Sequence, residues 1–330
     1  MQRIIKSIIV ILVIMTFCLT LAGCQSGQSQ QTETPKAIHV SYSTKPLNIP
    51  AVVALEKKLF EEAFAKDGIE VKWYELEGPA ITEALAAGSI DIATSLNYVS
   101  AIISKANGND ITVLAGYNKF PKGIGLVAGL DSEIKTVSAL KGKKVAVQKG
   151  TMLYEMVIKA LAEAELTVND VEIVGMASAD ALTALLQKQV DAAVIPDPLL
   201  TKGLGTQKIK MLRNAEGLIL AQSVIAGRTD FITHYPETTK RFLEIHQEIL
   251  DWIQANPDEA MAMIAKTNNM DIKAVKALYP KFDFTSAIDV QNRDALKESA
   301  RFMKENALLK NDIDTDAVIN DLVDTSYLPQ

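Results

Sequence analysis

The chain is poor in residues that several large classes of protein require. It has two cysteines, Cys18 and Cys24, and three histidines among 330 residues. That supply is too small for a zinc cluster, a disulfide scaffold or a histidine-based metal site. Aromatic residues make up only 6%, and Trp73 and Trp252 fall inside an expected strand and an expected helix, so no aromatic cage for a quaternary ammonium is evident. The formal net charge of −6 argues against a nucleic-acid binder.

Catalytic motifs are also missing. No nucleophile stands beside an identifiable base, and the H-E-x-x-H, P-loop and G-x-G-x-x-G patterns do not occur. We therefore expect no enzyme activity, no cofactor and no metal. An apolar content of 48% over 330 residues nevertheless predicts an ordinary folded protein with about two domains, each large enough to bury a core.

The N-terminal segment has the pattern of a secretory signal. Arg3 and Lys6 precede an almost unbroken apolar run at 7–21, shorter than the roughly 20 residues that a membrane-spanning helix needs. The run ends in Leu-Ala-Gly-Cys, which resembles a bacterial lipobox with Cys24 as the acylated residue. We expect residues 1–23 to be a lipoprotein signal peptide. The alternative is a plain signal anchor with a chance cysteine.

The next segment has the composition of a tether. Residues 25–36 (QSGQSQQTETPK) hold nothing apolar to bury. We expect Cys24 and the tether, residues 24–37, to hold the folded body at the extracytoplasmic face of a bacterial membrane.

Beyond the tether, apolar periodicity alternates between strand and helix. Strands are expected at 38–43, 69–74, 90–93, 111–115, 124–128, 144–147, 171–174 and 192–195, and helices at 51–64, 79–87, 98–106, 152–164 and 179–187. This alternation predicts an α/β fold with largely parallel sheets covered by helices on both faces. From Asp230 onward the chain is expected to be nearly all helical, with Pro236, Pro257 and Pro280 at breaks or starts.

A weak internal repeat has an offset of one hundred residues. Residues 81–93 (ITEALAAGSIDIA) match residues 181–193 (ALTALLQKQVDAA), so that Asp91 and Asp191 each begin an expected strand. Each aspartate is more often a turn cap than a ligand contact. The repeat predicts two lobes built on the same β-α-β plan.

Polar residues gather where expected strands lead into helices. In open α/β sheets, ligands bind at this edge, where helix N-termini present unpaired N–H groups. Any one junction is more often a plain helix cap. The five junctions are 43–45 (STK), 94–98 (TSLNY), 150–152 (GTM), 177–180 (ASAD) and 196–198 (PDP). Of these, Gly150-Thr151 is the strongest candidate anion site, and Asp197 could accept a hydrogen bond from a ligand amine.

Several of these segments together resemble a known family, the substrate-binding proteins for nitrate, taurine and aliphatic sulfonates. The resemblance covers roughly residues 38–230. It rests on 88–93 (GSIDIA), 105–108 (KANG), 140–146 (LKGKKVA), Gly150-Thr151, 190–194 (VDAAV) and Asp197-Pro198.

The resemblance implies a two-lobed periplasmic-binding-protein type II fold with a hinge and a mostly helical C-terminal segment. It implies a permease and an ATPase of an ABC importer as partners, and ligand contacts at Thr44, Asn97, Thr151 and Asp197. On this reading lobe 1 is 38–128, lobe 2 is 129–221, and 222–330 returns to lobe 1. The hinge then lies near Gly129 and near 218–221.

The function expected from the residues and the resemblance together is capture of a small anion or zwitterion by a monomeric, membrane-anchored protein. Alternatives are a thiamine-precursor pyrimidine as ligand, a ligand sensor, or an enzyme on the same scaffold. Lys45, Lys119 and Lys122 are the candidate cations of the cleft. The expected ligand-binding residues are Thr44, Lys45, Asn97, Tyr98, Gly150, Thr151, Met152, Asp180, Asp197 and Pro198.

Overall fold

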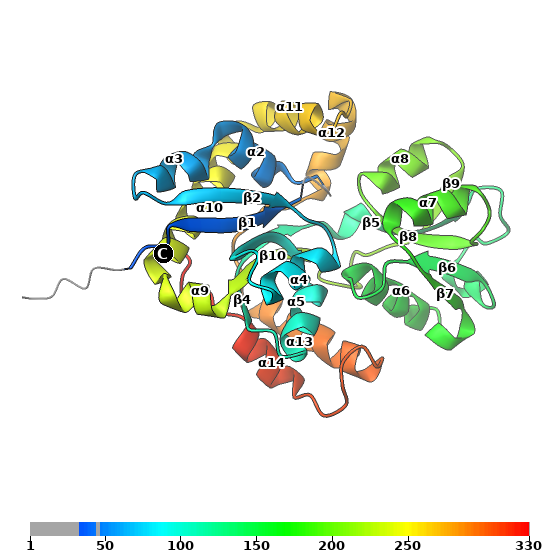
Figure 1. The fold of residues 1–330 in the computed structure, drawn as a ribbon. Coiled ribbons are helices and arrows are strands. Elements are labelled where there is room, and N and C mark those ends of the chain that lie inside the picture. Colours follow the sequence, from blue (N-terminus) through cyan, green and yellow to red (C-terminus); the bar gives the residue numbers. More distant parts are fainter. Residues whose placement is uncertain (1–32, 44–46, 330) are drawn as a thin grey trace, which may run out of the picture. The chain divides into compact units, whose positions relative to one another are not determined.

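The first sheet combines early strands with one late strand. In the computed structural model, which describes residues 33–43 and 47–329, β1 pairs in parallel with β2 and β3, whereas β10 runs antiparallel to β3 and β4 (Figure 1). Across the sheet the order is β2 (Glu70–Glu75), β1 (Ala37–Tyr42), β3 (Ile92–Asn97), β10 (Gln222–Arg228) and β4 (Ile111–Lys119). We call this sheet and its helices lobe 1.

The second sheet repeats this arrangement. Strand β6 pairs in parallel with β7 and β8, and β5 runs antiparallel to β8 and β9. The order is β7 (Glu172–Gly175), β6 (Lys144–Val147), β8 (Ala192–Pro196), β5 (Ile124–Gly129) and β9 (Ile209–Asn214). We call this sheet and its helices lobe 2. Both sheets are therefore mixed, and the expectation of largely parallel sheets is wrong for β5 and β10.

The strand pairing also corrects the expected lobe boundary. The strand placed in lobe 1 at 124–128 belongs to the second sheet, because the short 3₁₀ helix η1 (Pro121–Gly123) turns the chain directly after β4. The first crossing between the sheets is thus at η1 rather than near Gly129. The second crossing lies between Asn214 and Gln222, a segment that includes the expected position at 218–221.

The helices of lobe 1 lie on both faces of its sheet. The single helix expected at 51–64 is two helices, because Lys58 has a left-handed backbone with φ 51°. Among the described residues, the helices before the second sheet are α2 (Ile49–Lys57), α3 (Leu59–Ala65), α4 (Pro79–Ala86) and α5 (Tyr98–Ala106).

The C-terminal third returns to lobe 1, where α10 and α11 pack against α2, and α13 and α14 pack against α5 (Figure 1). Pro236 and Pro257 begin helices, as predicted, because proline is tolerated in a first turn. The elements are α9 (Thr229–His234), α10 (Pro236–Ala255), α11 (Pro257–Thr267), α12 (Ile272–Leu278), η4 (Tyr279–Lys281), α13 (Val290–Glu305) and α14 (Thr315–Leu322).

Lobe 2 has fewer helices around its sheet. Its elements are η2 (Val137–Leu140), α6 (Met152–Glu163), η3 (Val168–Asp170), α7 (Ser178–Leu186) and α8 (Leu199–Gly205). One buried apolar cluster runs from lobe 1 to the α6 side of lobe 2, and a second lies between the second sheet and α7 and α8. Within residues 33–43 and 47–329, no helix combines the length and the apolar character needed to cross a membrane.

The internal repeat has the same backbone role in each lobe. The carboxylate of Asp91 accepts the N–H of His39 in β1 at 2.8 Å, and that of Asp191 accepts the N–H of Lys144 in β6 at 2.8 Å. Each aspartate thus ties the start of the third parallel strand to the start of the first. The sequence repeat therefore corresponds to a structural repeat, and both aspartates are structural.

Candidate functional site

Three of the expected functional residues lie outside the part of the chain that the structure describes. These are Cys24, the expected lipidation site, and Thr44 and Lys45, which follow β1 in the sequence. The other expected residues can be placed.

The junction between β3 and α5 is a well-formed helix cap. Asn97 is the last residue of β3, and its Oδ1 accepts the N–H of Val99 at 2.9 Å and of Ser100 at 3.4 Å. Capping of this kind holds the first turn of α5 in place and offsets the lack of helix partners for its N–H groups. Tyr98 follows as the first helical residue and is buried.

The junction between β6 and α6 is built in a similar way. Gly150 has φ 72°, a conformation that glycine adopts without the steric cost of a side chain. Thr151 is buried, and its hydroxyl donates to the carbonyl of Gln148 at 2.8 Å and accepts the N–H of Leu153 at 3.3 Å. Met152 then begins α6 and is buried in the core rather than presented to solvent.

These two junctions, one from each lobe, meet. The hydroxyl of Ser100 in the first turn of α5 donates to the carbonyl of Gly150 at 3.1 Å. Gly78, just before α4 in lobe 1, lies close to Gln148 of lobe 2. A Cβ at this position would be only 3.0 Å from Nε2 of Gln148. The N-terminal ends of α5 and α6 therefore come together from opposite lobes.

A buried polar network lies one helical turn behind this meeting point. The phenol of Tyr98 donates a hydrogen bond to Oε2 of Glu155 in α6, and Nζ of Lys159 lies 3.2 Å from Oε1 of the same carboxylate. Lys159 also reaches Glu298 of α13 at 3.4 Å. Burial, and next the charge of Glu155, raises the pKa of Tyr98 well above its usual value, so the phenol keeps its proton and remains a donor.

At the junction after β8, the expected residue Asp197 is paired with a lysine that the sequence did not single out. Asp197 is 1% exposed, and its Oδ1 accepts the N–H of Thr201 at 2.8 Å. Its Oδ2 accepts a hydrogen bond from Nζ of Lys281 at 2.8 Å, and the same ammonium lies 3.0 Å from Oγ1 of Thr201. Pro198, joined to Asp197 by a cis peptide bond, precedes α8.

Other expected groups lie apart from this cluster. Asp180 is exposed in the first turn of α7. Of the candidate cations, Lys119 donates to Oδ1 of Asn292 at 2.8 Å, and Lys122 pairs with Glu216 at 3.4 Å. Lys281, in contrast, lies at a strand-to-helix junction beside Asp197. The sequence around that junction does not indicate this lysine, because it lies 84 residues beyond Asp197 in the chain.

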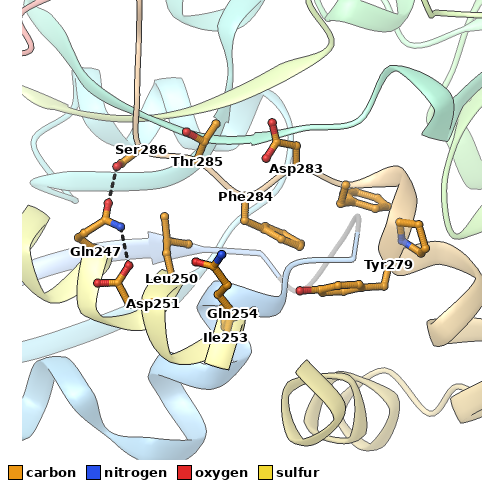
Figure 2. Close-up of a pocket in the computed structure, with 12 residues that line it drawn as sticks. Gln247, Leu250, Asp251, Ile253, Gln254, Tyr279, Asp283, Phe284, Thr285 and Ser286 are labelled. Carbon is orange, nitrogen blue, oxygen red and sulfur yellow. Dashed lines mark hydrogen bonds between the residues drawn. The ribbon is translucent and has the colours of Figure 1, made fainter. Parts of the chain in front are cut away.

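A cavity of about 340 Å³ lies in lobe 1, between α10 and the segment after α12 (Figure 2). In its lining, Oε1 of Gln247 accepts a hydrogen bond from the hydroxyl of Ser286 at 2.6 Å, and Nε2 of Gln247 donates to Oδ1 of Asp251 at 2.9 Å. None of the expected ligand-binding residues lines this cavity. Across residues 33–43 and 47–329, no group of three or more His, Cys, Asp or Glu side chains is placed to hold a metal ion.

Comparison with known proteins gives consistent similarities. The family model described as NMT1/THI5 like matches residues 46–260. A protein of Bacillus subtilis (strain 168), named an aliphatic sulfonates-binding protein, is 30% identical over 325 residues, which cover 96% of this chain and 95% of that protein.

Two solved structures are similar in fold. The alkanesulfonate-binding protein of Xanthomonas axonopodis pv. citri bound to MOPS superposes with a TM-score of 0.79 at 22% identity, over 88% of this chain and 99% of that chain. The periplasmic aliphatic sulphonate binding protein of Escherichia coli superposes with a TM-score of 0.76 at 25% identity, over 88% of this chain and 92% of that chain. The two-lobed periplasmic-binding-protein fold expected from the sequence is therefore confirmed.

Proposed function

The chain belongs to the NMT1/THI5-like family of ABC-transporter substrate-binding proteins, and from this premise we propose that it captures an aliphatic sulfonate or a related small anion and delivers it to an importer. It is a binding protein of the extracytoplasmic space and not an enzyme. The relatives named for sulfonates favour that ligand class over a thiamine-precursor pyrimidine.

The observation that carries the proposal is the meeting of two helix N-termini from opposite lobes. The hydrogen bond from Ser100 to the carbonyl of Gly150 places the starts of α5 and α6 side by side. Each start contributes the positive end of a helix dipole and the first-turn N–H groups that the caps do not engage. Asn97 already accepts the N–H groups of Val99 and Ser100, and Thr151 accepts that of Leu153. A sulfonate or nitrate has several acceptor oxygens and one negative charge, so it matches this set of donors.

The ligand-binding residues proposed for this site are Asn97, Tyr98, Gly150, Thr151 and Met152. Their capping side chains hold the first turns in place, and the first-turn N–H groups that the caps leave open supply the contacts. Thr44 and Lys45, which follow β1 in the sequence, complete the proposed set. Because the donors come from both lobes, a bound anion stabilises the closed arrangement, and the importer then recognises that arrangement.

The attachment to the membrane is part of the same proposal. Cys24 follows a segment that fits a lipoprotein signal, and the polar residues after it supply a tether. A lipid on Cys24 would keep a monomeric binding protein near the permease and ATPase. This anchoring also leaves the folded lobes free to open and close.

Calorimetric titration tests the ligand class. Propane-1-sulfonate, taurine, nitrate and a thiamine-precursor pyrimidine are titrated into the purified protein, with acetate at equal ionic strength as the control. At a free concentration of a hundred times its Kd, a ligand should raise the free energy of unfolding by about 2.7 kcal/mol. Thermal unfolding with and without the ligand detects a change of this size. Binding of the pyrimidine together with no response to any sulfonate or nitrate would contradict the proposal.

A further inference from the structure

Lys281 places a fixed positive charge against the carboxylate that would otherwise receive a ligand amine. Its Nζ lies 2.8 Å from Oδ2 of Asp197 and 3.0 Å from Oγ1 of Thr201. The remaining carboxylate oxygen, Oδ1, already accepts the N–H of Thr201. Both oxygens of Asp197 are therefore engaged, and the side chain is fully buried.

Asp197 lies at the same sheet edge as the proposed anion site. Strands β6 and β8 are parallel neighbours in which Ala146 is paired with Ala193. Gly150 and Asp197 each lie four residues beyond that pair, so both follow the carboxyl ends of adjacent strands. A ligand with its anionic group at Gly150-Thr151 would have its other end available to this neighbouring junction.

The ammonium is held from lobe 1 by a rigid support. The ring of Phe282, next to Lys281, stacks on Phe120 with centroids 5.3 Å apart. The following residue, Asp283, exchanges two backbone hydrogen bonds with Lys119 at the end of β4, at 2.8 and 2.9 Å. These two contacts hold in place the backbone segment that carries Lys281.

The pair also lies beside the first crossing between the lobes. The N–H of Asp197 donates to the carbonyl of Gly123 at 2.7 Å, and Gly123 ends η1. Segments next to a hinge axis move least when lobes rotate. We therefore expect the contact between Asp197 and Lys281 to persist when the lobes rotate.

We propose that Lys281 is a specificity-determining residue that fills the position of a ligand amine, so that the site selects plain sulfonates over aminosulfonates such as taurine. This inference rests on the proposed function and narrows it. An incoming ammonium would have to share carboxylate oxygens that already accept hydrogen bonds from Lys281 and Thr201, and it would meet the like charge of Lys281. A methyl group in the same place carries neither cost.

The test compares taurine with propane-1-sulfonate, in which a methyl group replaces the ammonium. Calorimetry on the wild-type protein should show tighter binding of propane-1-sulfonate. In Lys281→Met the affinity ratio should shift toward taurine by about tenfold or more, because a charged hydrogen bond to Asp197 becomes available. Lys276→Met, which removes a lysine paired with Asp258 on the surface of the same lobe, is the matched control and should leave the ratio unchanged.

A second variant keeps the inference testable if loss of the buried ion pair prevents Lys281→Met from folding. In Asp197→Asn the lysine remains and no carboxylate opposes it, so propane-1-sulfonate should stay preferred over taurine. Tighter binding of taurine than of propane-1-sulfonate by the wild-type protein or by Asp197→Asn, or an unchanged ratio in folded Lys281→Met, would overturn the inference while leaving sulfonate capture intact. If the wild-type protein binds neither sulfonate, the proposed function itself fails.

Discussion

Tyr98 and Glu155 form a buried hydrogen bond that joins α5 of lobe 1 to α6 of lobe 2. The phenol is the donor, and the carboxylate has Lys159 as its ionic partner. A contact of this kind favours the closed arrangement of the lobes, since opening would leave a buried charge with one partner fewer.

Tyr98→Phe should therefore loosen the closed state. We expect the unfolding free energy to fall by about 1–3 kcal/mol, because the carboxylate loses a charged hydrogen bond. Ligand affinity should fall as well, since a smaller fraction of the protein is closed before binding. Urea unfolding, calorimetry and the radius of gyration from small-angle scattering measure the three effects. Tyr74→Phe, at an exposed tyrosine, is the control, and equal effects in both variants would contradict the prediction.

Thr151→Val removes the side-chain cap of α6 and leaves the backbone able to keep its conformation. A proline would disturb the backbone as well, because the φ of −130° at this position does not fit a proline ring. We expect a loss of about 1 kcal/mol of stability and weaker sulfonate binding, since the first turn of α6 loses its cap. Thr206→Val is a close match, because the Thr206 hydroxyl also bonds the carbonyl three residues back and the N–H two residues on. Affinity should be retained in Thr206→Val, and retained affinity in Thr151→Val would remove this helix start from the site.

His246 should make the protein less stable in mild acid. Its ring is 2% exposed and stacks on Tyr117, and burial lowers its pKa from 6.5 to about 4. Between these values the unfolded chain binds a proton that the folded protein does not, so stability is full above pH 6.5 and is lost as the pH falls toward 4. The whole effect is on the order of 3 kcal/mol.

Urea unfolding at pH 4.5 and pH 7 measures this dependence. In His246→Phe, which keeps a ring against Tyr117, the part of the pH dependence due to the histidine should disappear. His234→Gln, at the exposed histidine of α9, should behave like the wild-type protein. An unchanged pH dependence in His246→Phe would show that other groups are responsible.

Cys24→Ser tests the anchor in a bacterial host. Without a thiol at this position no lipid can be attached, so the protein should move from the membrane fraction to the soluble fraction and should not incorporate labelled fatty acid. Cys18→Ser, inside the expected signal peptide, should change neither readout. Labelling of the Cys24→Ser protein would exclude this cysteine as the lipidation site.

Local patterns predicted most elements of the fold. Strand β6 and the start of α6 were placed at the observed residues, because apolar periodicity and capping act over a few residues. The repeat around Asp91 and Asp191 correctly predicted two sheets of similar plan. Strand order was beyond local signals, since whether β5 and β10 join the first or the second sheet depends on partners distant in sequence.

The candidate site was predictable only in part, for the same reason. Asn97 and Thr151 are helix caps that their own junctions specify. Asp197 was identified as an acceptor, but its occupant Lys281 comes from a segment whose position is set by pairing of Asp283 with β4 and by stacking of Phe282. Long-range packing of this kind produces no recognisable pattern in the sequence around Lys281.

The position of β10 has a consequence for the order in which the two lobes fold during export. Lobe 2 takes all five of its strands from one uninterrupted stretch, 124–214, whereas the sheet of lobe 1 has a gap between β3 and β4 until residues 222–228 are present. During export from the N-terminus, lobe 2 can therefore complete its core first. The earliest-emerging strands must wait, with exposed edges, for a late segment to arrive. Secretion of this protein should accordingly depend on chaperone protection of its N-terminal half more than of its middle.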